Sequence, residues 1–311
     1  MIIHTGMRTD IPAFYTPWLL GRLQEGFVLV RSPYDPQTLT RYDLSPSLVD
    51  LLCFCSKNPA PLLDHMDALK RYETYWHVTI TPYGPEIEPG LPDKRNVIRT
   101  FQELSRKVGP DRVVWRYDPI FVDEVYTEGR HLEAFAKMAR ALEGYTRVCI
   151  ISFIDLYAKV RRNFPQVREV ETRQRIELGR EMVRIAAGCG MTLRTCSEGD
   201  ELAAWGADCR GCMTREVYEQ ALGRRLIFPR QSSGRKGCAC WLGADIGAYD
   251  SCGHFCRYCY ANSSRENVLR NRKMHDPASP LLIGYPQSTD RIRQARQESW
   301  LDRQMSIFDL S

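Results

Sequence analysis

The sequence lacks several features that would assign it to a well-defined class of protein. No apolar run approaches the roughly 18 residues that a membrane-spanning helix needs, and the longest, at 148–154, is the length of a strand. The first ten residues, MIIHTGMRTD, show no charged stretch followed by a long apolar one. We therefore expect no signal peptide, no membrane partner and a cytoplasmic location. We find no internal repeat and no low-complexity tract either.

Charge of one sign and glycine-rich turns are also scarce. Lys and Arg number 43 against 38 Asp and Glu, a net charge of +5, which is small for a protein that coats nucleic acid. No turn of the GxGxxG or Walker type follows an expected strand. The isolated Gly188-Cys189-Gly190 is better explained as a helix stop. Nucleotide-binding open-sheet folds are thus disfavoured.

Short apolar segments alternate with segments of helical periodicity, which predicts parallel strands joined by crossover helices. At least seven such units favour a (β/α) TIM-type barrel, complete or partial. The expected strands lie at 2–4, 27–30, 48–54, 77–81, 113–115, 148–153, 191–194 and 244–249.

The expected barrel spans residues 1–260 and includes a loop-rich cysteine segment at 196–243. Within that segment, 224–236 is rich in Arg and predicted to be an irregular loop. We expect 261–311 to be a helical extension packed on the barrel, with a charged surface helix at 289–301.

Polar side chains follow many of the expected strands, where the chemistry of such barrels takes place. Asp10, Asp118 and Asp155 have a second explanation, because each could cap the helix that follows. The full set is Arg8, Asp10, Lys57, Asn58, Thr79, Thr81, Arg116, Asp118, Ser152, Asp155, Thr195 and Glu198.

Cysteine is abundant, with 12 residues, and eight of them fall between Cys196 and Cys259. A chain of 311 residues does not need disulfides to fold, and a reducing compartment disfavours them. Twelve thiols therefore point to metal or redox chemistry.

The sharpest motif is SCGHFCRYCYAN at 251–262, which has the spacing C-x3-C-x2-C in a loop at 252–259. Thiolates of Cys252, Cys256 and Cys259 can bind three irons of one [4Fe–4S] cluster and leave the fourth iron open. A zinc site is an alternative, with His254 or an upstream cysteine as fourth ligand. An electron-transfer cluster with a distant fourth ligand is another.

The motif resembles the signature of the radical S-adenosylmethionine (SAM) superfamily, and Tyr258 occupies its aromatic position. The resemblance implies that SAM binds the open iron and is cleaved reductively, producing a radical that abstracts hydrogen from substrate. It also implies an electron donor such as flavodoxin or ferredoxin. The string YCYA at 258–261 is similar to the variant of the spore photoproduct lyase branch.

In most radical SAM proteins this motif follows the first strand, whereas here it lies near the C-terminus. A circular permutation would explain the position, with 244–249 filling the first-strand slot beside the strand at 2–4. Arg8, Asp10 and Thr81 would then belong to the cofactor side, with Tyr258 against the adenine. Arg116 and Asp118, on a strand across the barrel, are the candidate catalytic residues on the substrate side.

The whole chain resembles the family called domain of unknown function 1848. The strings that carry the resemblance are RTDIPAFY (8–15), KNP (57–59), TITPYG (79–84), WRYDP (115–119), TCSE (195–198), DIGAY (245–249), the cysteine triad and HDP (275–277). The resemblance implies radical-SAM-like cysteines near the C-terminus. One departure is Gly6-Met7 before Arg8, where the family usually has Ser-Arg.

A second metal site is also a candidate. Cys196, Cys212, Cys238 and Cys240 match cysteines of that family, and four thiolates could hold a second iron–sulfur cluster or a structural zinc. Buried, unliganded thiols are the alternative. Cys209 forms a local C-x2-C with Cys212, but a thioredoxin-like role would need a strand before it and a helix behind it.

Three functions remain open at this point. The first is a radical SAM-type enzyme acting on an unknown substrate. The second is a non-catalytic iron–sulfur or zinc protein, structural or electron-transferring. The third is a nucleic-acid repair lyase, suggested by the photoproduct-lyase-like string and the Arg-rich segment but given little support by the charge of +5.

Overall fold

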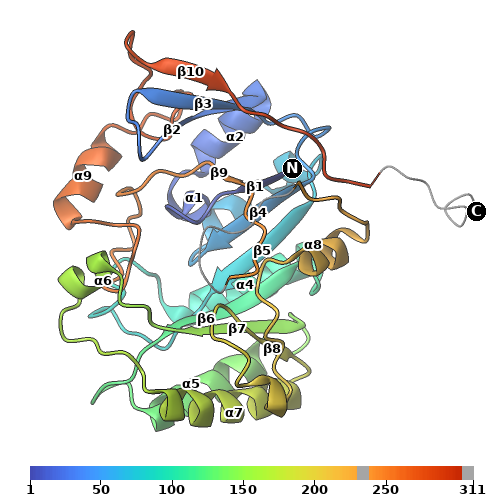
Figure 1. The fold of residues 1–311 in the computed structure, drawn as a ribbon, viewed down its shortest axis with the longest axis vertical. Coiled ribbons are helices and arrows are strands. Elements are labelled where there is room, and N and C mark those ends of the chain that lie inside the picture. Colours follow the sequence, from blue (N-terminus) through green and yellow to red (C-terminus); the bar gives the residue numbers. More distant parts are fainter. Residues whose placement is uncertain (230–237, 303–311) are drawn as a thin grey trace, which may run out of the picture.

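A seven-stranded parallel sheet forms the centre of the protein in the computed structural model, which describes residues 1–229 and 238–302 (Figure 1). Every neighbouring pair of strands runs parallel, as the alternation of strands and helices predicts. From one edge to the other the strands are β8 (Thr192–Thr195), β7 (Val148–Phe153), β6 (Val113–Ile120), β5 (Thr74–Thr79), β4 (Leu51–Ser56), β1 (Ile2–His4) and β9 (Ala244–Asp245).

Helices cover both faces of this sheet. Side chains of α4, α5 and α7 pack on one face, against residues such as Leu52, Trp76 and Trp115. Side chains of α8 pack on the other face, against Leu51 and Tyr75, because successive residues of a strand point to opposite sides. The helices are α1 (Ile11–Phe14), α2 (Thr16–Glu25), α3 (Ala60–Leu63), α4 (Lys94–Val108), α5 (Glu128–Ala141), α6 (Ala158–Asn163), α7 (Thr172–Gly188), α8 (Arg215–Leu222) and α9 (Arg265–Lys273), with 3₁₀ turns η1 (Met66–Leu69) and η2 (Ala203–Trp205).

The sheet is open. In the described part of the chain, β8 and β9 form its two edges and do not pair with each other, so the closed form of the expected barrel is not found. The reason lies between these strands. The described residues of this connection, 196–229 and 238–243, form loops, α8 and η2 rather than another strand–helix unit, and α8 occupies one face of the sheet instead of extending it.

The placement of β9 agrees with the expected permutation. β9 pairs in parallel with β1, with Ala244 opposite Ile3 and Asp245 opposite His4. The strand is shorter than the expected 244–249, although the N–H of Ile246, one residue beyond it, still donates to the carbonyl oxygen of His4 at 3.0 Å.

One expected strand of the barrel belongs elsewhere. The strand predicted at 27–30 is β2 (Phe27–Arg31), which pairs antiparallel with β3 (Thr38–Asp43) in a separate three-stranded sheet. The short connection between these strands contains two prolines and an aspartate, which favour a turn, and a hairpin connection produces antiparallel strands.

The prediction of a helix at 289–301 is wrong. Residues Arg291–Gln294 form β10, which pairs in parallel with β3 and completes the three-stranded sheet (Figure 1). The four side chains are all exposed, so no apolar face holds this segment as a helix, and pairing with the free edge of β3 satisfies its backbone instead. The described part of the extension, 261–302, contains one helix, α9.

Two further observations concern the rest of the chain. None of the described helices is long and apolar enough to cross a membrane. Residues 230–236 of the Arg-rich segment lie outside the described residues, so the nucleic-acid hypothesis cannot be followed there.

Candidate functional site

The cysteine loop begins where β9 ends, and residues after β1 fix its start. The Asp245 carboxylate accepts hydrogen bonds from the backbone N–H groups of Met7 and Gly247, each at 2.9 Å. Farther along, the Tyr15 hydroxyl donates to the carbonyl oxygen of Ser251 at 2.6 Å. The loop is therefore held at the carboxyl end of the sheet, where the strand ends carry their polar residues.

His254, in the middle of the loop, uses both ring nitrogens in protein contacts. Nε2 lies 2.8 Å from Oδ2 of Asp10, and Nδ1 lies 3.3 Å from the carbonyl oxygen of Gly90. The ring also packs on Phe14, with ring centres 4.6 Å apart. His254 thus anchors the loop to α1, which leaves neither nitrogen available to a metal.

The three thiols of the triad lie close enough to influence one another's ionisation. Burial raises the pKa of Cys252 well above its usual value, and the charges of Cys259 and Cys256 raise it further. Burial likewise raises the pKa of Cys256, to about 12, although Lys57 opposes the shift. The backbone N–H of Ala261 donates to Sγ of Cys259 at 3.3 Å. Three thiolates here need a compensating cation, as metal ligation would provide.

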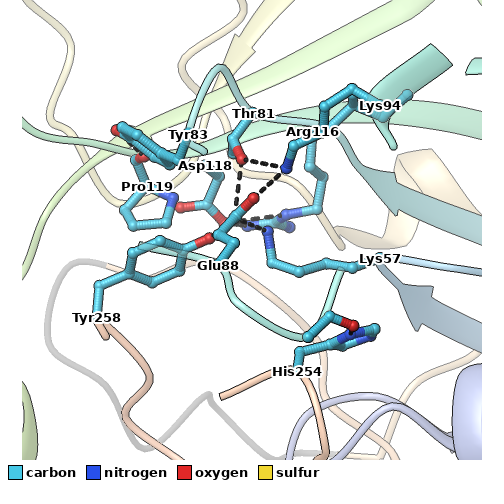
Figure 2. Close-up of polar contacts among 12 residues, drawn as sticks. Lys57, Thr81, Tyr83, Glu88, Lys94, Arg116, Asp118, Pro119, His254 and Tyr258 are labelled. Carbon is cyan, nitrogen blue, oxygen red and sulfur yellow. Dashed lines mark hydrogen bonds and ion pairs between the residues drawn. The ribbon is translucent and has the colours of Figure 1, made fainter. Parts of the chain in front are cut away.

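A buried carboxylate, Glu88, lies beside this loop (Figure 2). Glu88 is 2% exposed and accepts hydrogen bonds from Nζ of Lys57 and Oγ1 of Thr81, both at 2.8 Å. Nζ of Lys94 and the hydroxyl of Tyr258 contact the same carboxylate. Segments that are distant in sequence therefore meet at one side chain.

Two lysines and one glutamate give this network an excess of positive charge. Burial alone would raise the pKa of Glu88, but the charges and hydrogen bonds of Lys57 and Lys94 outweigh it and lower the pKa to about 2. Glu88 is therefore ionised. The charge of Cys256 acts on both lysines, so the excess positive charge faces the cysteine loop.

Arg116 and Asp118 form a pair at the carboxyl end of β6, behind the Glu88 network in Figure 2. Nη2 of Arg116 lies 2.6 Å and Nε 3.1 Å from Oδ2 of Asp118. The other carboxylate oxygen accepts from the Ser152 hydroxyl. Nη1 of Arg116 is not part of the contact with Asp118 and lies 3.6 Å from Sγ of Cys212. Asp118 is thus an ion-pair partner and not a helix cap.

The second set of cysteines also comes together. Sγ of Cys212 lies 3.3 Å from Sγ of Cys196 and 3.5 Å from Sγ of Cys240, and Cys238 is hydrogen-bonded to Cys240. Cys209 is not part of this chain of contacts, since its sulfur points to the carbonyl of Ala207 at 3.9 Å. As the side chains stand, no group of three or more His, Cys, Asp or Glu residues in the described segments is arranged to hold a metal ion.

The candidate cofactor residues are placed in different ways. Thr81 and Tyr258 meet at Glu88. Asp10 caps α1 by accepting a hydrogen bond from the N–H of Ala13 at 3.1 Å. It also holds the cysteine loop through His254, so its carboxylate is used in structural contacts. Arg8 lies 3.7 Å from Asp245 and faces the ring of Tyr249.

The sequence alone did not indicate several residues of this region. Glu88 and Lys94 carry no spacing or periodicity that marks them. His4 and His77 lie on the same side of the sheet as Arg116, and both are fully buried with neither ring nitrogen hydrogen-bonded to any described residue. Burial lowers the pKa of His4 to about 4, so its imidazole is neutral.

Comparison with known proteins agrees with the resemblance seen in the sequence. No curated protein matches the chain. A family model does match, over residues 2–261, which include all strands of the seven-stranded sheet, both groups of cysteines and the Glu88 network. The chain therefore belongs to the family described as domain of unknown function (DUF1848).

Proposed function

We propose that this protein is an iron–sulfur enzyme of the radical SAM type, built on a partial, circularly permuted (β/α) barrel. The observation that carries the proposal is the position of the C-x3-C-x2-C loop. It follows edge strand β9, which runs parallel to β1, so the three thiols lie at the carboxyl ends of the strands. Polar residues of β4, β5 and β6 converge on the same end, as parallel α/β enzymes require.

Three closely spaced cysteines suit a [4Fe–4S] cluster, which Cys252, Cys256 and Cys259 would hold once their side chains turn toward a common centre. An N–H donor supports the sulfur of Cys259, and the charge of Lys57 opposes the burial that raises the pKa of Cys256. Because both nitrogens of His254 are engaged, this histidine is not available as a fourth ligand. That argues against the form of the zinc alternative in which His254 is the fourth ligand, and it agrees with an iron that keeps an open position.

When bound, the cluster and SAM supply reductive cleavage of SAM and hydrogen-atom abstraction from substrate. The protein's own residues bind and orient these cofactors and the substrate. Lys57 and Lys94 place positive charge beside the cysteine loop, and Tyr258 joins that loop to Glu88. Arg116 and Asp118 form the polar pair we assign to the substrate side. Arg8 and Thr81 complete the polar edge on which SAM would lie.

The proposal extends to the partners and the compartment. Such an enzyme needs a one-electron donor, for which flavodoxin or ferredoxin is the expected class. None of the twelve cysteines forms a disulfide, which agrees with a reducing cytoplasm. The substrate is left open, because the strand-end polar groups do not select one chemical class.

Anaerobic reconstitution tests the proposal. We expect iron and sulfide uptake, an EPR signal after reduction, and release of 5′-deoxyadenosine and methionine from SAM, measured by mass spectrometry. Cys256→Ala should abolish all three. Cys149→Ala is the matched control, because Cys149 is buried in β7 away from the loop. An iron-loaded, reducible sample that neither binds nor cleaves SAM would instead support the electron-transfer or structural alternative.

A further inference from the structure

We infer that Cys196, Cys212, Cys238 and Cys240 form a structural zinc site, separate from the cysteine triad and independent of its chemistry. The four residues come from three segments: the end of β8, the loop before α8, and the segment before β9. The spacing of their sulfurs favours a single tetrahedral ion over a second iron–sulfur cluster.

The sulfur–sulfur distances favour a zinc ion over an iron–sulfur cluster. Zn–S bonds of about 2.3 Å in a tetrahedron place the sulfurs about 3.8 Å apart. Cys212 lies 3.3 Å from Cys196 and 3.5 Å from Cys240, so small side-chain rotations bring these thiols to that spacing. A [4Fe–4S] cluster binds each thiolate on a different iron and needs wider separations. The triad has no sulfur–sulfur hydrogen bond among its three described thiols, in contrast to this group.

The backbone already holds the three segments together. The N–H of Thr195 donates to the carbonyl of Asp208 at 3.0 Å, and the N–H of Trp241 donates to the carbonyl of Met213 at 2.9 Å. These bonds place Cys196 and Cys240 on either side of Cys212. The arrangement of the thiols therefore does not depend on a disulfide, and none of the four cysteines forms one.

The charges around the group suit a thiolate site. Zinc with four thiolates carries two negative charges, and Nη1 of Arg116 lies 3.6 Å from Sγ of Cys212 to offset part of that charge.

The position of the group also explains what a metal would do there. Where the structure describes this segment, at 196–229 and 238–243, it contains little regular structure besides α8 and η2, and such a segment gains stability from a structural metal. A cavity of about 220 Å³, lined by Cys238, Cys240 and Cys209 among others, leads to the group and provides an entry path.

The test measures metal content without reference to catalysis. The triple variant Cys252→Ala, Cys256→Ala, Cys259→Ala removes the proposed iron ligands, and it should still contain about one zinc ion per chain. X-ray absorption should show four sulfur neighbours at about 2.3 Å. Replacement of zinc by Co(II) should produce the intense visible bands of a tetrahedral thiolate site.

Single substitutions identify the ligands. In the triple-variant background, Cys212→Ser and Cys238→Ser should each lose zinc, with folding checked by circular dichroism. Cys209→Ser is the matched control, because Cys209 completes a C-x2-C with Cys212 in sequence yet stands apart from the group. It should keep its zinc.

Three results would overturn the inference. One is iron with inorganic sulfide on the four cysteines, which would establish a second cluster. Another is a metal-free triple variant whose four thiols all react with an alkylating agent. The last is loss of zinc from Cys209→Ser with retention in Cys212→Ser. None of these results depends on whether the triad binds iron or cleaves SAM.

Discussion

The hydroxyl of Tyr258 donates a hydrogen bond to the carboxylate of Glu88, although 170 positions separate the two residues in the chain. Tyr258 is the aromatic residue inside the cysteine motif, and Glu88 is the buried acid that two lysines share. This bond makes the cysteine loop part of the strand-end network and not a separate appendage. It also directs the hydroxyl of Tyr258 to the protein, leaving its ring for other contacts.

The charge of Glu88 should be essential to stability. Glu88→Gln keeps the shape of the side chain but leaves the partly buried Lys57 and Lys94 without their acid, and we expect a loss of about 3 kcal/mol in the free energy of unfolding. Glu133→Gln is the control, because it breaks only the exposed pair with Lys137 and should cost less than about 1 kcal/mol. Urea denaturation measures both. Equal losses would contradict the role given to Glu88.

Tyr258→Phe tests the hydroxyl separately from the ring. Loss of a hydrogen bond to a charged group should lower the free energy of unfolding by about 1.5–3 kcal/mol, while iron binding by the triad is retained. Tyr285→Phe removes a similar bond to Asp276 at an exposed position and should change stability by less than about 0.5 kcal/mol. A Tyr258→Phe protein as stable as wild type would show that the bond to Glu88 is dispensable.

Asp245 should give the protein a characteristic dependence on pH. Burial raises the pKa of Asp245 to about 6, even though Arg8 opposes the shift. Between its usual value of 3.8 and about 6, the folded state holds a proton that the unfolded state has lost. Stability should therefore fall as pH rises through this window, by about 3 kcal/mol in total.

The comparison with Asp245→Asn isolates this group. The variant cannot titrate at this position, so the free energy of unfolding of the wild type, measured relative to the variant, should decrease between about pH 4 and pH 6.5. Denaturant titrations at several pH values provide the measurement. A difference that stays constant or increases with pH would show that Asp245 is ionised normally in the folded protein.

Arg116 should influence the zinc site that we infer. Arg116→Gln removes the cation next to Cys212, and changes of this kind beside a metal site typically weaken metal affinity about 10–100-fold. Competition with a chromogenic chelator measures the affinity. Arg210→Gln serves as control. Arg210 lies on the loop that carries Cys212, but its side chain is exposed and pairs with Asp208. Equal zinc affinity in both variants would show that Arg116 does not contribute to the zinc site.

Local patterns in the sequence were sufficient for part of this picture. The alternation of apolar and helical segments predicts parallel strands because each element's periodicity is set by its own residues. The triad is equally local, since three cysteines within eight positions are neighbours in any fold. The place of β9 beside β1 followed from the same motif, once it was compared with the order found in radical SAM proteins.

Other features depend on contacts between distant residues, and no local pattern encodes them. The segment at 289–301 has charged residues that suit a helix, but the free edge of β3 supplies backbone partners and makes Arg291–Gln294 a strand. Whether the sheet closes depends on how 196–243 packs, which local periodicity does not reveal.

The two groups of cysteines show which features the sequence determines locally and which depend on the tertiary structure. Sequence spacing by itself determined the triad and paired Cys209 with Cys212. The tertiary structure instead placed Cys212 with Cys196 and Cys240, and it brought Glu88, Lys57 and Lys94 to the triad. The physical reason is that parallel strands deliver their ends to one edge of the sheet whatever their distance along the chain. The members of a strand-end site are therefore chosen by strand order and register, which only the folded chain possesses.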